Sequence, residues 1–132
     1  MNQYFKKVNN NPRGIRTGDC VIRAIANAEG REWVEVFDDL TKLARKLFTA
    51  PTYRDCYKVY LDKYEKMPAL RQGTFESKKH RVRAEEFHIY EDLRKGTFIV
   101  RQANHLTVVR DGITVDTWDS SDRASYIIWR VK

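Results

Sequence analysis

Residues 97–118, TFIVRQANHLTVVRDGITVDTW, carry the pattern that decides the fold. Apolar and β-branched residues dominate this stretch, as is typical of β-strands. Asp111 and Gly112 stand between two such runs, and Asp-Gly is the strongest short signal for a two-residue hairpin turn. We therefore predict an antiparallel hairpin around this turn, within a larger sheet. The expected strands are residues 97–102, 106–110, 113–118 and 126–131.

Helical patterns precede the strands. Asp19 can cap a helix that begins at Cys20 and ends at Gly30. Apolar residues then recur at three- and four-residue steps up to Pro51, which predicts a long amphipathic helix. Because helices come first and strands last, we predict an α+β fold in which N-terminal helices pack on a C-terminal antiparallel sheet. Further helices are expected over 52–65 and 83–95, with irregular chain over 68–82.

The composition is that of one ordinary domain. The chain has 132 residues, so we predict a single domain over 1–132. Hydrophobic residues make up 42%, which is enough to form a core without disulfides. No apolar run approaches the roughly 20 residues of a membrane span, and no apolar signal-peptide segment follows the N-terminus. We therefore expect a cytoplasmic protein without a membrane partner.

The net charge of +7 keeps nucleic acid or an acidic protein surface open as a partner. The densest basic run is residues 78–83, KKHRVR, although a solvated loop is the simpler interpretation of such a run. Neither His80, His88 nor Cys56 falls at a spacing typical of metal ligands, and no glycine-rich phosphate loop is present. We therefore expect no metal and no cofactor.

The two cysteines have different settings. Cys56 lies in a helical pattern, where we expect it to pack as a small apolar residue. Cys20 follows Asp19 at the start of an apolar helix, where the partial positive charge of the helix terminus lowers the pKa of a thiol. Such a thiol becomes a nucleophile if a base lies beside it and an acceptor orients that base. Cys20 is therefore a candidate nucleophile, and His105 is its candidate base.

The hairpin register predicts which acid lies beside His105. A two-residue turn pairs Thr107 with Asp116 and His105 with Trp118. Cross-strand partners share one face of a sheet, so Asp116 is the diagonal neighbour of His105, within reach of a side-chain hydrogen bond. Asp119 falls on the opposite face unless the strand bends. Asp116 is therefore the expected orienting acid, and Asp119 is the alternative.

Three short segments together resemble the papain-like cysteine peptidases and amidases. They are GDC at 18–20, NHLT at 104–107 and DTWD at 116–119. The likeness is strongest to small uncharacterised papain-like proteins of bacteriophages and Gram-positive bacteria. In that superfamily the cysteine opens a helix, and the histidine and the acid follow on adjacent antiparallel strands. The resemblance therefore implies a papain-like fold, in the cytoplasm of a bacterium or of a phage-infected host cell.

The resemblance also implies roles for individual residues. Cys20, His105 and Asp116 would form a catalytic triad, and Trp118 would shield the bond between the histidine and the acid from water. Papain-like peptidases usually place a glutamine before the cysteine to help hold the oxyanion, and this chain has three asparagines at 9–11 instead. One of them would take that role together with the backbone N–H of the cysteine, and Asn11 is the candidate.

Two functions remain open at this point. The first is a cysteine-dependent hydrolase, a peptidase, isopeptidase or amidase, which acts by acyl transfer on a protein, peptide or amide substrate. The alternative is a non-enzymatic, phage-encoded basic protein that uses the same fold to bind a host protein or nucleic acid. The triad favours the first function, and the net charge favours the second.

Overall fold

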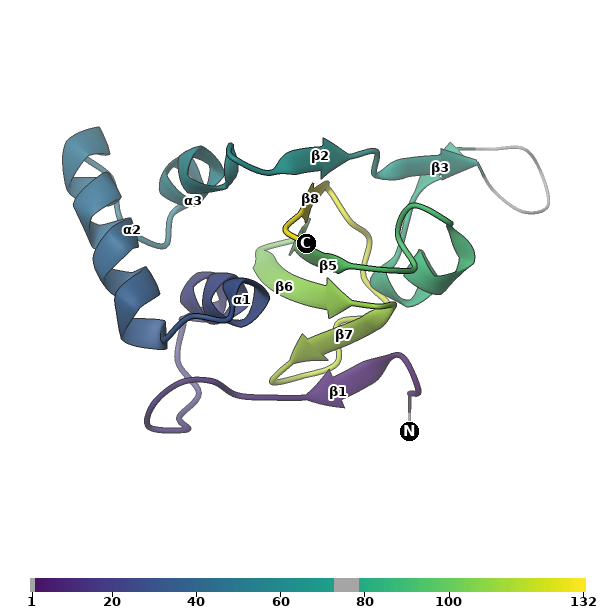
Figure 1. Cartoon of the computed structure of the whole chain (residues 1–132), viewed down its shortest axis with the longest axis horizontal. Helices are drawn as coiled ribbons and strands as arrows, with labels where there is room; N and C mark the ends of the chain where they lie inside the picture. Colours follow the sequence, from purple (N-terminus) through teal and green to yellow (C-terminus); the bar gives the residue numbers. More distant parts are fainter. Residues whose placement is uncertain (1, 73–78) are drawn as a thin grey trace.

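The helices and strands follow the expected order along the chain. The computed structural model describes residues 2–72 and 79–132, with three α-helices in the N-terminal half and the longest strands in the C-terminal half (Figure 1). The fold class is α+β, as predicted. The helices are α1 (Cys20–Glu29), α2 (Trp33–Leu47), α3 (Arg54–Leu61) and the 3-10 helix η1 (Ala84–Ile89).

Within the described residues, the main sheet has six strands in the order β1-β7-β6-β5-β8-β2. Its pairs are antiparallel, except that β1 runs parallel to β7. The sheet is therefore mixed rather than purely antiparallel. The sequence did not predict β1, because this strand is too short to show a strand pattern. A second sheet joins β3 to β4. The strands are β1 (Phe5–Lys7), β2 (Glu65–Met67), β3 (Leu70–Gln72), β4 (Lys79–Arg81), β5 (Thr97–Gln102), β6 (His105–Arg110), β7 (Ile113–Asp116) and β8 (Ile127–Arg130).

Both faces of the central strands are buried. Ile99 and Trp129 pack with apolar residues of α1, α2 and α3 on one face. Phe98 and Val100, which alternate with Ile99 along β5, pack with Phe87 of η1 on the other face. Consecutive apolar residues in a strand are expected when both faces of the sheet are covered. The sheet therefore lies between a helical layer and a thinner layer built around η1.

The central hairpin has the predicted register. Arg110 pairs with Ile113 across the turn, and Val108 pairs with Val115 further along the strands. Asp111 and Gly112 have φ angles of 50° and 81°. Positive φ at both turn residues is the requirement of a type I′ turn, which Asp-Gly satisfies at low cost. The register of β6 and β7 is thus determined by local sequence.

The helix predicted over 83–95 is wrong in length and type. Only η1 forms there, and Tyr90 ends it in an extended conformation with φ −99° and ψ 129°. The backbone N–H of Glu85, at the start of η1, donates to the Ser121 carbonyl at 2.7 Å. Phe87 and Leu93 are both fully buried against the sheet. Contacts with distant chain therefore override the local helical preference.

Residues 52–82 also differ from expectation. α3 ends at Leu61, and the residues after it form β2, which pairs with β8 rather than extending the helix. The chain predicted to be irregular contains the short strands β3 and β4. The first residue of the basic run, Lys78, lies outside the described residues. No helix in the described part of the chain is long and apolar enough to span a membrane.

Candidate active site

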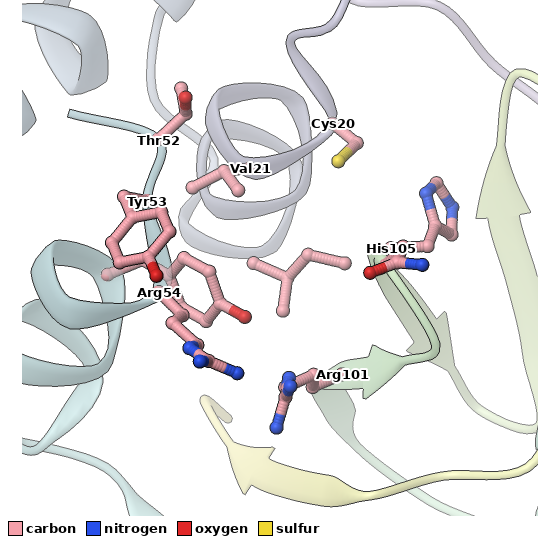
Figure 2. A pocket seen from close by; sticks show the side chains of 10 residues that line it. Cys20, Val21, Thr52, Tyr53, Arg54, Arg101 and His105 are labelled. Carbon is pink, nitrogen blue, oxygen red and sulfur yellow. The ribbon is translucent and has the colours of Figure 1, made fainter. Parts of the chain in front are cut away.

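Cys20 is the first residue of α1, and the packing of this helix determines where the thiol lies. The helix is held against β6 by a continuous apolar surface that includes Ile25 and Leu106. The Asp19 carbonyl accepts the first helical hydrogen bond, from the Arg23 N–H, at 2.9 Å. The N-terminal end of α1 therefore faces the beginning of β6. There the thiol and the ring of His105, the first residue of that strand, line the same cavity (Figure 2).

His105 is held on its other side by Asp116. The Nε2 atom of the ring lies 2.7 Å from Asp116 Oδ2, and the same oxygen accepts a hydrogen bond from the Thr107 hydroxyl at 2.6 Å. The Thr117 backbone N–H donates to Asp116 Oδ1 at 2.7 Å. The side chains of the histidine and the acid are only 7% and 3% exposed. The diagonal relation expected from the hairpin register is therefore present as a buried hydrogen bond.

The ionisation of these groups favours a reactive thiol. Burial raises the pKa of Cys20, but hydrogen bonds with the His105 ring and the Leu106 backbone, with the charge of His105, bring it below its ordinary value. Burial lowers the pKa of His105, but hydrogen bonds with Asp116 and Cys20 outweigh it and raise the pKa to about 9. Burial raises the pKa of Asp116, but the His105 and Thr107 bonds lower it overall. At neutral pH this arrangement favours a thiolate paired with an imidazolium.

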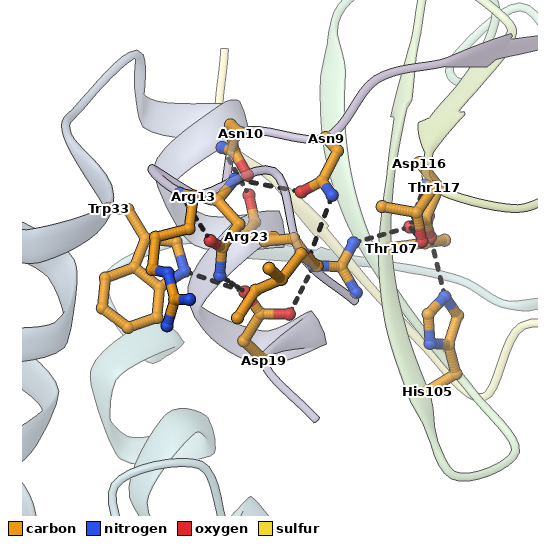
Figure 3. A network of polar contacts seen from close by, with 12 residues as sticks. Asn9, Asn10, Arg13, Asp19, Arg23, Trp33, His105, Thr107, Asp116 and Thr117 are labelled. Atoms are coloured by element: carbon orange, nitrogen blue, oxygen red, sulfur yellow. Dashed lines mark hydrogen bonds and ion pairs between the residues drawn. The ribbon is translucent and has the colours of Figure 1, made fainter. Parts of the chain in front are cut away.

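A buried arginine connects the acid to the start of α1. Arg23 Nη1 lies 2.9 Å from Asp116 Oδ1, and its Nε lies 2.7 Å from Asp19 Oδ1 (Figure 3). The Trp33 indole also donates to Asp19 Oδ2, at 2.9 Å. Arg23 was not among the residues expected at the site, although a cation within an apolar helix, four residues after an aspartate, is a usable signal. Arg23 positions the carboxylate that holds His105.

A cavity of about 430 Å³ opens beside the thiol. Cys20 and His105 form one side of it, and residues of α3 and β5 form the other (Figure 2). The cavity is large enough for a side chain and its neighbouring peptide group.

Trp118 and Asp119 follow β7 and turn in different directions. The Trp118 ring lies against the His105 ring, with 4.7 Å between ring centroids and 41° between planes. Asp119 instead accepts hydrogen bonds from the Ser121 backbone N–H at 3.0 Å and from the Asn2 side chain at 3.1 Å. The geometry therefore places Asp116, and not the alternative Asp119, next to the histidine.

Asn11 does not lie at the cavity. Its side-chain N–H donates to Asp19 Oδ2 at 2.9 Å, and the amides of Asn9 and Asn10 bond to backbone carbonyls. None of the three lines the large cavity. The expectation that Asn11 holds the oxyanion is therefore corrected, because its amide serves the network at the start of α1. The N–H groups in the first turn of that helix are donors near the thiol, and the Asn104 amide also lines the cavity.

The other cysteine has no base beside it. Cys56 is fully buried, its thiol lies 3.5 Å from the Leu40 carbonyl oxygen, and burial raises its pKa. It packs as an apolar residue in the helical layer. In the part of the chain that the structure describes, no group of His, Cys, Asp and Glu side chains is arranged to hold a metal ion.

No protein-family model, curated protein or solved structure matches this chain. The function of the site must therefore be inferred from its chemistry. A thiol of lowered pKa at a helix terminus, a histidine bonded to a buried acid and an open cavity in front of them are the components of nucleophilic acyl transfer.

Proposed function

We propose that this chain is a cysteine-dependent hydrolase that cleaves an amide bond, as a peptidase, isopeptidase or amidase does. The observation that carries the proposal is the His105 ring, which has Nε2 2.7 Å from the Asp116 carboxylate and lines the same cavity as the Cys20 thiol. Because Nε2 is bound to the acid, Nδ1 is the ring nitrogen that can exchange a proton with the thiol. The three residues then act as nucleophile, general base and orienting acid.

In the first half of the reaction, the Cys20 thiolate attacks the carbonyl carbon of the substrate. A C–S bond forms, and the π electrons of the carbonyl move to its oxygen, which the N–H groups at the start of α1 stabilise. The tetrahedral intermediate then collapses, and the C–N bond breaks while the His105 imidazolium gives its proton to the leaving nitrogen. The products are a free amine and a thioester on the sulfur.

In the second half, water attacks the thioester carbon while the neutral His105 ring takes a proton from it. The C–S bond breaks, the carboxylic acid leaves, and the thiolate and imidazolium are restored. Asp116 keeps the ring in the tautomer that carries hydrogen on Nε2. Trp118 covers the ring and keeps water away from that bond.

The arrangement of the elements supports a papain-like form of this chemistry. The cysteine opens an α-helix, and the histidine and the acid lie on the neighbouring antiparallel strands β6 and β7. This is the order and the placement that the resemblance to papain-like enzymes implies. We therefore propose the papain-like fold for this chain, with a short sheet and a small cavity in place of a long peptide-binding cleft.

Alkylation by iodoacetamide near neutral pH tests the proposal. Cys20 should react much faster than Cys56, because only Cys20 has a lowered thiol pKa and access to a cavity. His105→Ala should abolish the difference, and the matched variant His88→Ala, at an exposed position, should leave it unchanged.

Equal labelling of the two cysteines, with no effect of His105→Ala, would show that the thiolate is not activated. Salt-sensitive binding to heparin or DNA that survives Cys20→Ala would then favour the basic binding protein instead. Cleavage of simple amide, ubiquitin-like and peptidoglycan substrates by the wild type, and not by Cys20→Ala, would establish the reaction class.

A further inference from the structure

Two arginines from different elements line the cavity beside Cys20. Arg54 is the first residue of α3, and Arg101 lies on β5. Figure 2 shows both guanidinium groups projecting into the same space, on the side away from His105. Tyr57, which is 7% exposed, also lines this cavity. The cavity therefore has a reactive end and a cationic end.

Neither of these arginines has an acidic partner among the residues that the structure describes. Other arginines do: Arg23, Arg31 and Arg71 each lie within 3 Å of an Asp oxygen. No Asp or Glu lines the cavity. Two cations in one concave site without a carboxylate repel each other, and an anion bound between them would relieve this repulsion. The cavity is therefore suited to bind an anion.

The surrounding dipoles strengthen this preference. Arg54 stands at the N-terminus of α3, where a cation opposes the helix dipole rather than complementing it. The N-terminus of α1 also faces the cavity, at Cys20. Asp55 beside it complements the dipole of α3, whereas Arg54 opposes it, and an anion in front of Arg54 would offset this.

We propose that the cationic end of the cavity binds a carboxylate of the substrate, adjacent to the amide bond that Cys20 attacks, with Arg54 and Arg101 as specificity-determining residues. This inference rests on the proposed hydrolase function and assigns its substrate class, an acidic peptide or amide. Planar guanidinium groups form paired hydrogen bonds with the two oxygens of a carboxylate, and converging from two elements they can hold it in one orientation. The carboxylate belongs either to an acidic side chain or to a chain terminus.

Alkylation of the intact protein by an anionic and a neutral reagent of nearly the same size tests the proposal. In both reactions the Cys20 sulfur displaces iodide from carbon, so iodoacetate and iodoacetamide differ only in their charge. The ratio of the iodoacetate rate to the iodoacetamide rate should fall roughly threefold to tenfold for each of Arg54→Gln and Arg101→Gln. Arg101→Lys keeps the positive charge and should retain most of the ratio.

Arg45→Gln is the matched control, because Arg45 lies in the last turn of α2, outside the cavity, and its loss changes the net charge equally. It should leave the ratio unchanged. Added salt should lower the wild-type ratio toward that of the Arg54→Gln, Arg101→Gln double variant. Arg54 is exposed, so its replacement leaves folding intact and keeps the test valid even if Arg101→Gln unfolds the protein.

The outcomes separate this inference from the function on which it rests. Slow reaction of Cys20 with both reagents would overturn the proposed function. Fast reaction with iodoacetamide, together with one ratio shared by the wild type and the arginine variants, would overturn only the carboxylate site.

Protection of Cys20 identifies the source of the carboxylate. N-acetylglutamate α-amide carries only a side-chain carboxylate, and N-acetylglutamine carries only a terminal one. The compound that slows the alkylation of Cys20 by iodoacetamide more strongly shows whether the site takes a side-chain or a terminal carboxylate. The neutral N-acetylglutamine amide should protect least. Equal protection by all three compounds would contradict the proposal.

Discussion

The two sides of the Cys20–His105 pair treat positive charge in opposite ways. On one side, Arg23 is buried and bonded to two carboxylates, those of Asp19 and Asp116. On the other side, Arg54 and Arg101 face a cavity without a carboxylate among the described residues. We call the first region the network side and the second the pocket side. An arginine that is already paired with carboxylates can only hold those groups in place, whereas one without a carboxylate partner is available to bind a ligand.

Burial explains why each charge on the network side needs an opposite charge beside it. The Arg23 side chain is 11% exposed, and those of Asp19 and Asp116 are 4% and 3% exposed. A charge removed from water to this extent is tolerated only if opposite charges and hydrogen bonds replace the lost solvation. On the pocket side, water in the cavity solvates the guanidinium groups until a ligand displaces it. The same residue type therefore serves structure on one side and recognition on the other.

The variant with the largest expected effect on the network side is Arg23→Gln. It leaves two buried carboxylates without their cation, so we expect a loss of about 3–5 kcal/mol in the free energy of unfolding, measured with urea. Arg83→Gln is the control, because Arg83 is 59% exposed and pairs with Glu85 at 3.8 Å. A loss for Arg23→Gln no larger than about 1 kcal/mol, the range of exposed ion pairs, would contradict the assignment of a buried network.

Asp116→Asn replaces the carboxylate by an amide of nearly the same shape. Among such substitutions on the network side, we expect it to lower the reactivity of the Cys20 thiol most. The His105 pKa, about 9 in the wild type, should fall without the carboxylate, and the imidazolium that stabilises the thiolate should be lost at neutral pH. The pKa of Cys20 then rises, and alkylation at pH 6–7 slows roughly tenfold for each unit of that rise.

The measurement is the rate of iodoacetamide labelling between pH 5 and 10, with the His105 ring titration followed by NMR. In the wild type, the ring should lose its proton only as the pH rises through about 9. A ring that titrates at its ordinary value in the wild type, or the same pH profile in both proteins, would disagree with the proposed ionisation.

Trp118→Ala should have a smaller effect. Without the indole, water reaches the His105 ring and competes for its bond to Asp116, so that bond weakens without being lost. The weaker bond should also raise the pKa of Cys20, and a rise of about half a unit would slow labelling roughly threefold at pH values below that pKa. Trp118→Phe keeps an aromatic cover and should restore most of the rate. Equal rates for the Ala variant and the wild type would rule out a shielding role.

The smallest expected effect on the free energy of unfolding belongs to a variant of the pocket side. Arg54→Gln is the same chemical change as Arg23→Gln, but it removes, from an exposed position, a charge that has no acidic partner among the described residues. The free energy of unfolding should therefore change by no more than about 0.5 kcal/mol. The two variants should be measured in the same urea series. A large loss for Arg54→Gln would mean that this arginine has a structural role.

Local sequence was sufficient for the hairpin and for its chemistry. Asp111 and Gly112 determine the turn, the turn determines the register of β6 and β7, and the register places Asp116 beside His105. Each step covers only a few residues, which is why sequence reasoning could follow it. The helical start at Cys20 was predictable for the same reason.

Other features depended on distant contacts and were missed. β1 gains its hydrogen bonds only from β7, more than a hundred residues later in the chain. η1 replaces a predicted α-helix in a segment whose first N–H groups bond to carbonyls of residues 121 and 123 and whose Phe87 is buried against the sheet. The Asn11 amide was expected beside the thiol and bonds to Asp19 instead. In each case the partner could not be identified from local pattern, since hydrogen-bonding groups accept any suitable partner that the fold brings near.

By itself, then, the sequence determined the fold class, the central hairpin and the pairing of His105 with Asp116, because short-range turn geometry and strand alternation specify them. The tertiary structure alone decided that Arg23 joins the start of α1 to Asp116, and that Arg54 and Arg101 meet in one cavity. These arrangements join residues that are distant along the chain. They are set by the packing of α1 and α3 around the sheet, for which no local pattern contains the necessary information.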